Sequence, residues 1–240
     1  SVPDGTFNVD GLNTRRVTGR NTPSTVNAVF NVRNFWDGRA ARRFNGRNPF
    51  GDADVNARVL RVDDLGELEK VRLSINNASL ASQAVGPPNN NTEMSADGRD
   101  WLKLGKKMLS LQPLGRQGVH PEDSALGELA ITGGNGLNTT YGDLIRRAFA
   151  PQWWNSDLVV DAALNVLPGV TSPAAGGSLP TDQYTLMEAN FSMFWGLAIG
   201  LYESTLVSDD APYDQFAEGY SNALTPQQQF GLKLFVSTST

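Results

Sequence analysis

Apolar residues recur at helical spacing in several stretches of this chain, and polar segments rich in glycine, asparagine and proline separate them. Apolar side chains spaced three and four residues apart lie on one face of a helix and can be buried there. On this basis the sequence predicts helices over residues 65–85 with a break near Asn76 and Asn77, 97–111, 140–150 and 182–207. The last stretch is apolar on nearly all sides, so we expect it to form a central buried helix.

Capping residues and turn formers predict two shorter helices and several loops. Thr22-Pro23 predicts a short helix as far as Phe30, and Thr225-Pro226 predicts a helix as far as Phe235. Loops are predicted over residues 1–22, 86–91 and 168–180. The alternation of apolar and polar residues that is typical of strands is scarce. The predicted fold class is therefore mainly α, with long irregular loops.

The apolar pattern contains neither a signal peptide nor a membrane span. Residues 1–14 have no apolar core of the kind that signal peptides contain. The most apolar stretch, residues 191–201, is too short to cross a bilayer. The helix predicted from Pro226 comes last in the chain and has nothing after it to pack against, so we expect further sequence in the parent protein.

The composition excludes several kinds of chemistry. A net charge of −5 argues against nucleic acid as a partner, because that binding depends on clustered Lys and Arg. The chain has no cysteine and one histidine, His120, so it has no thiolate nucleophile and no covalent haem attachment site of its own. No Gly-x-Ser-x-Gly elbow accompanies His120, which we expect to be an ordinary exposed imidazole rather than a ligand or a catalytic base.

Three groups of residues resemble the bacterial di-haem cytochrome c peroxidase superfamily. They are residues 20–31 with Phe35-Trp36-Asp37-Gly38-Arg39, the spacing of Gln83, Pro87 and Glu93, and the tail over residues 198–235. That superfamily includes the methylamine-utilisation di-haem enzymes and the rubber oxygenases. The long stretch between Trp36 and Gln83 favours the rubber-oxygenase-like branch. In the superfamily, the tail leads directly into the second haem attachment motif.

The resemblance implies a cytochrome-c-like helical scaffold with two c-type haems in the parent protein. Residues 1–207 would be the remainder of the first haem domain including its distal pocket, and residues 208–240 would be the linker and the start of the second. Peroxide or dioxygen would meet the first haem, and electrons would arrive from the second haem through Trp36. The residues alone leave open that Trp36 is a buried aromatic that anchors a turn.

Glu93 matches the acidic residue over the open face of the first haem in the superfamily. Cleavage of an O–O bond needs a group that moves a proton between the two oxygens, and a partly desolvated carboxylate can do this. Gln83 matches a neighbouring pocket residue that can donate or accept a hydrogen bond, and Pro87 matches the pocket wall. From the residues alone, Glu93 is equally a helix cap or a solvated carboxylate ahead of a helix that starts near Ser95.

Asn21 resembles a residue that contributes to a calcium site in some members of the superfamily. A carbonyl oxygen suits calcium, but asparagine before Thr-Pro is also a common turn former. Arg39 belongs to a cluster with Arg42, Arg43 and Arg47 that would pair with haem propionates through charge-assisted bonds. A solvated arginine face that balances the nearby aspartates, such as Asp52, is the alternative.

The absence of any Cys-x-x-Cys-His motif leaves two functions open. In the first, the chain is the inter-haem segment of a periplasmic or secreted bacterial oxidoreductase, and the flanking haem-bearing segments are its partners. The chain would then be inactive by itself. In the second, it is a haem-less helical binding or structural module that is derived from the same scaffold.

Overall fold

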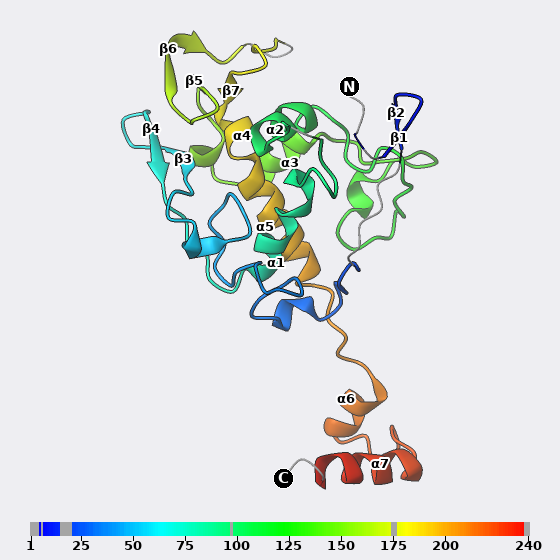
Figure 1. Ribbon diagram of the computed structural model, residues 1–240. Coiled ribbons are helices and arrows are strands. Elements are labelled where there is room, and N and C mark those ends of the chain that lie inside the picture. Colours follow the sequence, from blue (N-terminus) through cyan, green and yellow to red (C-terminus); the bar gives the residue numbers. More distant parts are fainter. Residues whose placement is uncertain (1–4, 6, 15–20, 97, 174–176, 238–240) are drawn as a thin grey trace.

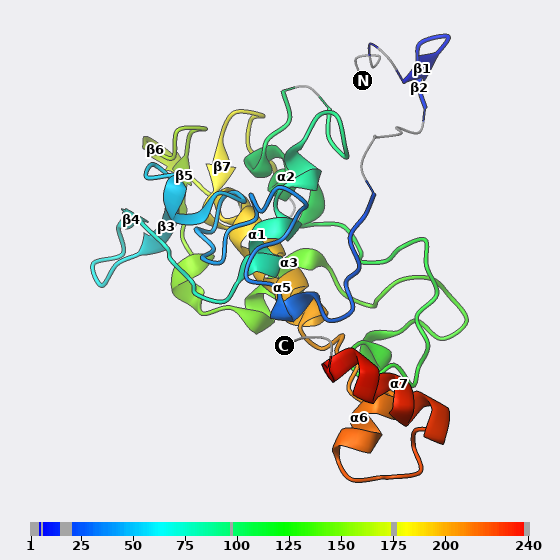
Figure 2. The same cartoon turned by 60° about the horizontal axis from the view of Figure 1, so that its bottom comes forward.

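The computed structural model describes residues 5, 7–14, 21–96, 98–173 and 177–237. Its centre is the helix α5, Phe191–Glu203, which runs through the main body (Figure 1). Helices α1 (Ser79–Ala84), α2 (Trp101–Met108) and α3 (Tyr141–Ala148) lie around α5 (Figure 2). A central helix is therefore present, and residues Phe191–Phe194 at its start are buried. The prediction that the helix is buried throughout is wrong, because Leu201 near its end is 69% exposed.

The prediction of a mainly α fold is wrong. The described chain is 32% helical and 13% strand, with seven α-helices and several small sheets. An antiparallel hairpin joins β3 (Val59–Val62) to β4 (Leu68–Val71), and a three-stranded sheet has the order β6-β5-β7, with bounds Val166–Thr171, Leu158–Val160 and Tyr184–Thr185. Part of the helix predicted over residues 65–85 is thus a strand, and only Ser79–Ala84 is helical there. The scaffold is a mixed one.

Three predicted helices are present but shorter than their apolar patterns. Asp100 caps α2 by accepting a hydrogen bond from the Lys103 backbone N–H, and Thr140 caps α3 in the same way. The long helix predicted over residues 182–207 is divided at Asn190 into α4 (Leu186–Ala189) and α5. The Asn190 side chain bonds the backbone of Leu60 and Trp153, so this break ties the helix to β3.

The N-terminal part of the chain contains little regular structure. A two-residue hairpin pairs β1 (Asn8–Val9) with β2 (Leu12–Asn13). The helix predicted from Thr22 is a single 3-10 turn, Ala28–Phe30. Further 3-10 turns cover Gly51–Ala53, Pro87–Asn89, Gly127–Leu129 and Pro151–Trp153. Part of the loops predicted at 1–22 and 168–180, and the start of the helix predicted at residue 97, lie outside the described residues.

Close contact between α1 and α5 determines where the end of α1 lies. A Cβ atom on Gly196 would lie 2.7 Å from Phe44 Cζ and 3.0 Å from the Ala81 carbonyl oxygen, so only glycine fits there. The indole N–H groups of Trp101 and Trp195 donate to the carbonyl oxygens of Val85 and Ala84, at 3.2 and 3.1 Å. The core therefore holds the end of α1 from two sides, and Gln83 lies at this end.

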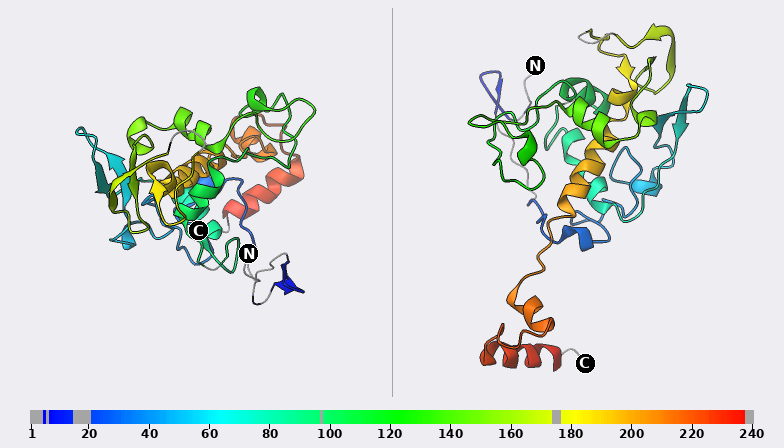
Figure 3. Two further views of the ribbon diagram at one scale, coloured as in Figure 1. Left: turned by 90° about the horizontal axis from the view of Figure 1, so that it is seen from above. Right: turned by 180° about the vertical axis from the view of Figure 1, so that it is seen from behind.

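Helices α6 (Pro212–Ala217) and α7 (Pro226–Ser237) lie away from the main body. An extended segment joins them to the end of α5 (Figure 1), and the view from behind in Figure 3 shows the same separation. Leu224 is the one buried residue that the structure describes between residues 208 and 237. The helix predicted from Thr225 is confirmed, and the Thr225 hydroxyl accepts a hydrogen bond from the Gln228 backbone N–H at 3.3 Å.

Candidate functional site: a cavity between the Phe35–Arg39 turn and the end of α1

All six residues that the sequence analysis selected line one cavity of about 710 Å³. Its wall consists of the segment Asn21–Pro23, the turn around Trp36, the end of α1 and the segment that follows it. The selected residues are Asn21, Trp36, Arg39, Gln83, Pro87 and Glu93. The structure thus brings them together, although they span more than seventy positions of the chain. Their chemical roles remain predictions.

A tight turn presents Trp36 at the cavity. The Gly38 backbone N–H donates to the Phe35 carbonyl oxygen at 3.0 Å, and Asn34 pairs with Ala40 through two backbone hydrogen bonds. Phe35 has a φ of 63°, which is unusual for a residue other than glycine. Trp36, which follows it, is 81% exposed. The interpretation of Trp36 as a buried anchor therefore does not describe this structure.

Arg39 is held in place from within the same turn. Its Nη1 donates to Asp37 Oδ2 at 2.9 Å, and its guanidinium carbon lies 3.9 Å from the centroid of the Phe35 ring. Desolvation would raise the pKa of Asp37, but hydrogen bonds from the Arg39 side chain and backbone outweigh it and hold that pKa below its ordinary value. Asp37 therefore stays ionised, and Arg39 keeps a fixed cationic face at the cavity.

Buried polar contacts join this turn to α1. Asn34 Nδ2 donates to Ser79 Oγ at 3.1 Å, and Ser79 Oγ donates to the Asn31 carbonyl oxygen at 2.8 Å. A Cβ atom on Gly86 would lie 3.2 Å from Phe35 Cζ, so the glycine allows the turn to approach the end of α1 closely. Gln83 and Pro87 lie on either side of this contact, and both face the cavity.

Glu93 lies in a turn that Asn90 organises. The Asn90 carbonyl oxygen accepts hydrogen bonds from the backbone N–H groups of Glu93 and Met94, both at 3.1 Å. Among the described residues α2 begins only at Trp101 and is capped by Asp100, so Glu93 is not the cap of that helix. Its Oε2 atom is buried and has no hydrogen-bond partner among the described residues. A carboxylate oxygen in that position needs a partner, because burying it unpaired is costly.

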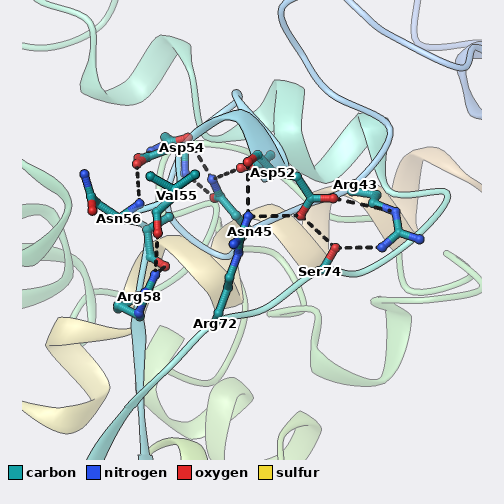
Figure 4. Close-up of polar contacts among 12 residues, drawn as sticks. Arg43, Asn45, Asp52, Asp54, Val55, Asn56, Arg58, Arg72 and Ser74 are labelled. Atoms are coloured by element: carbon teal, nitrogen blue, oxygen red, sulfur yellow. Dashed lines mark hydrogen bonds and ion pairs between the residues drawn. The ribbon is translucent and has the colours of Figure 1, made fainter.

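Two other arginines of the predicted cluster, Arg42 and Arg43, have partners outside the cavity. Figure 4 shows Arg43 and Arg72 meeting at Asp52, with N–O distances of 3.7 and 3.9 Å. Ser74 Oγ also donates to Asp52, at 2.9 Å. Arg42 bonds the side chain of Asn77. For Arg42 and Arg43 the structure therefore agrees with the alternative of local balancing, whereas Arg39 faces the cavity.

The described residues contain no group of three or more His, Cys, Asp or Glu side chains that could hold a metal ion. Asn21 is exposed at the cavity wall. His120 lies outside both the cavity and the core, and its Nδ1 accepts a hydrogen bond from the Glu122 backbone N–H at 3.1 Å. None of the helices in the described part of the chain is both long and apolar enough to cross a membrane.

The comparison with protein families finds a match in the N-terminal part of the chain. Residues 3–118 match the family described as di-haem cytochrome c peroxidase. This range contains Trp36, Gln83, Pro87 and Glu93, and it includes every described residue of the cavity. The resemblance predicted from the sequence is confirmed, and the family implies haem c in the parent protein.

A particular relative extends the match over most of the chain. The cytochrome c551 peroxidase of Pseudomonas aeruginosa is 27% identical over 219 residues, which cover 91% of this chain. The chain spans about a third (34%) of the length of that relative. No solved structure matches the chain. The two comparisons support a di-haem cytochrome c peroxidase-like protein.

Several residues that the sequence analysis did not select also line the cavity, among them Asn31, Arg33, Phe35 and Met94. Arg33 and Phe35 lie in or next to the motif that carries the resemblance, so the motif was the signal that could have found them. Met94 follows Glu93 directly. Asn31 is the last residue of the 20–31 segment that carries the resemblance, but no sequence pattern indicates its contact with Ser79.

Proposed function

We propose that this chain supplies the wall of a haem pocket in a di-haem peroxidase or oxygenase, as the segment between the two haem attachment motifs. The observation that carries this proposal is the cavity itself. Six residues selected from a family resemblance could have been scattered over the surface, yet all six line one cavity of about 710 Å³. The match of residues 3–118 to the family supports the same assignment.

The side chains of the cavity suit one side of a haem and lack the groups that attach it. Glu93 Oε2 is buried without a partner in the described chain, so it is ready to bond a ligand in the cavity. The chain has no thiol, and His120 lies elsewhere. The thioether and axial ligands would therefore come from flanking segments of the parent. When bound there, the haem supplies the iron at which peroxide or dioxygen is reduced.

Each selected side chain has a separate task in this proposal. Glu93 carries a proton between the two oxygens of the substrate, and Gln83 holds the substrate by a hydrogen bond. Pro87 shapes the wall, and Arg39, fixed by Asp37, pairs with a carboxylate of the cofactor. Trp36 lies on the path of electrons from the second haem, which its exposure at the cavity favours, since a partner macrocycle could cover it.

The proposal extends to the organisation and location of the parent. Residues 1–207 complete the first haem domain, and residues 208–240 link it to the second. Asn21 supplies one oxygen to a calcium ion whose other ligands lie on other segments. The parent is periplasmic or secreted in a bacterium and acts on peroxide or dioxygen, and this chain alone is inactive.

The alternative is a haem-less binding or structural module, which the lack of any thiol in the chain favours. The two functions differ in the protein isolated from its source. A protein well above 25.9 kDa with a Soret band supports the proposed function. A colourless protein of 25.9 kDa supports the alternative.

The catalytic part of the proposal is tested by Glu93→Gln in the haem-bearing parent. This change keeps the size of the side chain and removes its titratable group. We expect kcat for peroxide reduction to fall by about 10²–10⁴-fold, the usual contribution of a positioned acid or base, with KM nearly unchanged. The matched control is Glu122→Gln, which alters an exposed carboxylate remote from the cavity. Equal activity of the two variants would remove Glu93 from the mechanism.

A further inference from the structure

A second cavity, of about 490 Å³, lies beside the first and shares Arg39 with it. Two more arginines line it, Arg47 and Arg99. None of the described residues that line it is acidic, although the chain as a whole is acidic with a net charge of −5. Asp97, which lies between two lining residues in the sequence, is outside the described residues. Arg39 is paired with Asp37, whereas the guanidinium groups of Arg47 and Arg99 repel each other unless an anion lies between them.

Arg47 carries a largely desolvated charge in this cavity. Its Nη1 donates to the Ala189 carbonyl oxygen at 2.8 Å, which leaves most of its five N–H donors for other partners. Burial lowers the pKa of Arg47 below its ordinary value, and the charges of Asp100 and Asp54 oppose this only in part. The nearby carboxylates therefore do not fully compensate the Arg47 cation.

Arg99, unlike Arg47, is exposed, and its side chain has no partner among the described residues. In the described part of the chain its side chain forms no hydrogen bond or ion pair, whereas most other arginines there have a partner, as Arg61 has Glu69 and Arg146 has Asp143. Arg99 lies two residues before the start of α2, and its backbone N–H donates to the Ala96 carbonyl oxygen at 3.2 Å. An unpaired arginine at the wall of a cavity can bind an anion without breaking an existing contact.

The rest of the wall is apolar on one side and rich in amides on the other. Trp101 and Val85 are buried at the cavity, with Pro49 beside them, and the amides of Asn48, Asn89 and Asn90 line it too. A small inorganic anion would leave the apolar side of the wall uncovered, above all Phe50, which lines the cavity and is 52% exposed. A planar carboxylate accepts two parallel N–H bonds from a guanidinium, and an attached apolar group can pack on Phe50 and on the exposed edge of Trp101.

We propose that this second cavity is a binding site for an organic carboxylate with an apolar body. Arg47 and Arg99 bind the carboxylate, and Phe50 together with the edge of Trp101 contacts the apolar part. The carboxylate has two possible sources. One is a small free acid. The other is an acidic arm of the cofactor in the first cavity, which can reach past Arg39. Only the second source depends on the proposed function.

The test uses 3-phenylpropionate as the probe and its neutral amide, 3-phenylpropionamide, as the matched ligand. Binding to the 240-residue chain is measured by isothermal titration calorimetry at low ionic strength. We expect the amide to bind about tenfold or more weakly than the acid, because it lacks the charge-assisted bonds. Arg99→Gln should weaken binding of the acid by about tenfold and leave the amide unchanged.

The control variant is Arg116→Gln, which removes an exposed arginine remote from the cavity and should bind the acid as the wild type does. Arg99→Gln is preferred to a change at Arg47, whose bond to Ala189 supports the fold. Equal binding of acid and amide, or equal binding by Arg99→Gln and the wild type, overturns the proposal.

A second arm of the experiment distinguishes the two sources. The haem-bearing parent is titrated with the same acid. If the parent binds it as the bare chain does, the ligand is a free acid. If the bare chain binds it and the parent does not, the parent's own carboxylate fills the site. Failure of Glu93→Gln to affect catalysis would contradict the proposed function without altering either result.

Discussion

The turn at Phe35 holds a side chain in an unusual position at a local cost. A φ of 63° is disfavoured for a residue with a Cβ atom, and such strain persists only where surrounding contacts enforce it. Here the Asn34–Ala40 pair and the stacked Arg39 enforce it. The turn places Trp36 at the surface, where the residue is 81% exposed. Strained backbone beside an exposed aromatic at a cavity favours a role in function over one in packing.

Trp36→Phe separates these two roles. Because Trp36 is exposed, its loss should change the free energy of unfolding of the 240-residue chain by less than about 0.5 kcal/mol. In the haem-bearing parent, the same change should slow electron transfer between the haems and leave both haem spectra nearly intact. Stopped-flow spectroscopy measures the transfer, and chemical denaturation measures the stability. A destabilised chain with unchanged transfer would show that Trp36 only packs.

The residues of the first cavity could be predicted because they fall in motifs that are contiguous or closely spaced in the sequence. Their assembly could not be predicted from periodicity, since it depends on contacts such as Asn34 to Ser79. The second cavity escaped prediction for the same reason. Arg47 was assigned with its sequence neighbours to a cluster that would pair with haem propionates or form a solvated face, and Arg99 was not selected. Only the fold brings the two to one space.

At the scale of elements, the β3–β4 hairpin shows why the predicted helix of residues 65–85 failed. Leu68 and Val71 fit a helical spacing, but they fit a strand as well, and a short apolar run does not distinguish the two. The turn between β3 and β4 determines that a strand forms rather than a helix. The Asp63 carboxylate accepts hydrogen bonds from the Leu65 and Glu67 backbone N–H groups, both at 2.9 Å. The Asp63 side chain thus competes with helix formation for these backbone N–H groups, and a hairpin forms in place of the predicted helix.

A substitution at Trp195, on α5, tests how much the central helix contributes to the free energy of unfolding. Its ring lies 6.2 Å from that of Trp101 and 6.1 Å from that of Phe191, in a tilted aromatic cluster. Trp195→Ala should lower the free energy of unfolding by about 3 kcal/mol, as removal of a large packed aromatic does. Leu201→Ala, on the exposed part of the same helix, is the control and should cost about 0.5 kcal/mol or less. Equal costs measured by urea denaturation would contradict a packed cluster.

The raised pKa of Glu188, in α4, predicts that the stability of the fold depends on pH. Burial raises the pKa of this carboxyl, while hydrogen bonds from Thr185 and the charge of Lys106 oppose the rise. The folded carboxyl thus keeps its proton to a higher pH than the unfolded one. Its contribution to stability is therefore greatest at low pH and is lost as the pH rises through the raised pKa.

Glu188→Gln isolates this effect, because a glutamine at this position can still accept the capping hydrogen bond from the Thr185 N–H. At neutral pH the variant should equal or exceed the wild type in stability, by less than about 1 kcal/mol for a half-buried group. The advantage should disappear as the pH falls below the ordinary value of 4.5. Denaturation curves between these limits measure it, with the exposed Glu128→Gln as the control. A difference that is the same at every pH would exclude titration of Glu188.

At the scale of the whole molecule, the main body and the α6–α7 segment have different kinds of surface. The body buries its apolar residues around α5, whereas α7 exposes Phe230, Leu234 and Phe235, the last to 75%. Amphipathic helices reach full stability by packing, so the segment contributes little to the body as it stands. This agrees with the proposal that residues 208–240 lead into a second domain, and that residues 1–207 are the part that folds around the cavity.

A chain that ends at Asp210 tests this division. The cut keeps Ser208, whose backbone N–H donates to Asn27 Oδ1 at 2.7 Å and closes the body near the first cavity. Since Leu224 is the one buried residue described in the part beyond, removal of α6 and α7 should cost less than about 1 kcal/mol and shift Tm by less than about 4 °C. Differential scanning calorimetry measures Tm, and a chain that ends at Gly196, within α5, is the control that should not fold cooperatively. A much larger fall in Tm for the Asp210 chain would show that α6 and α7 belong to the first domain, and the boundary at residue 207 would then be wrong.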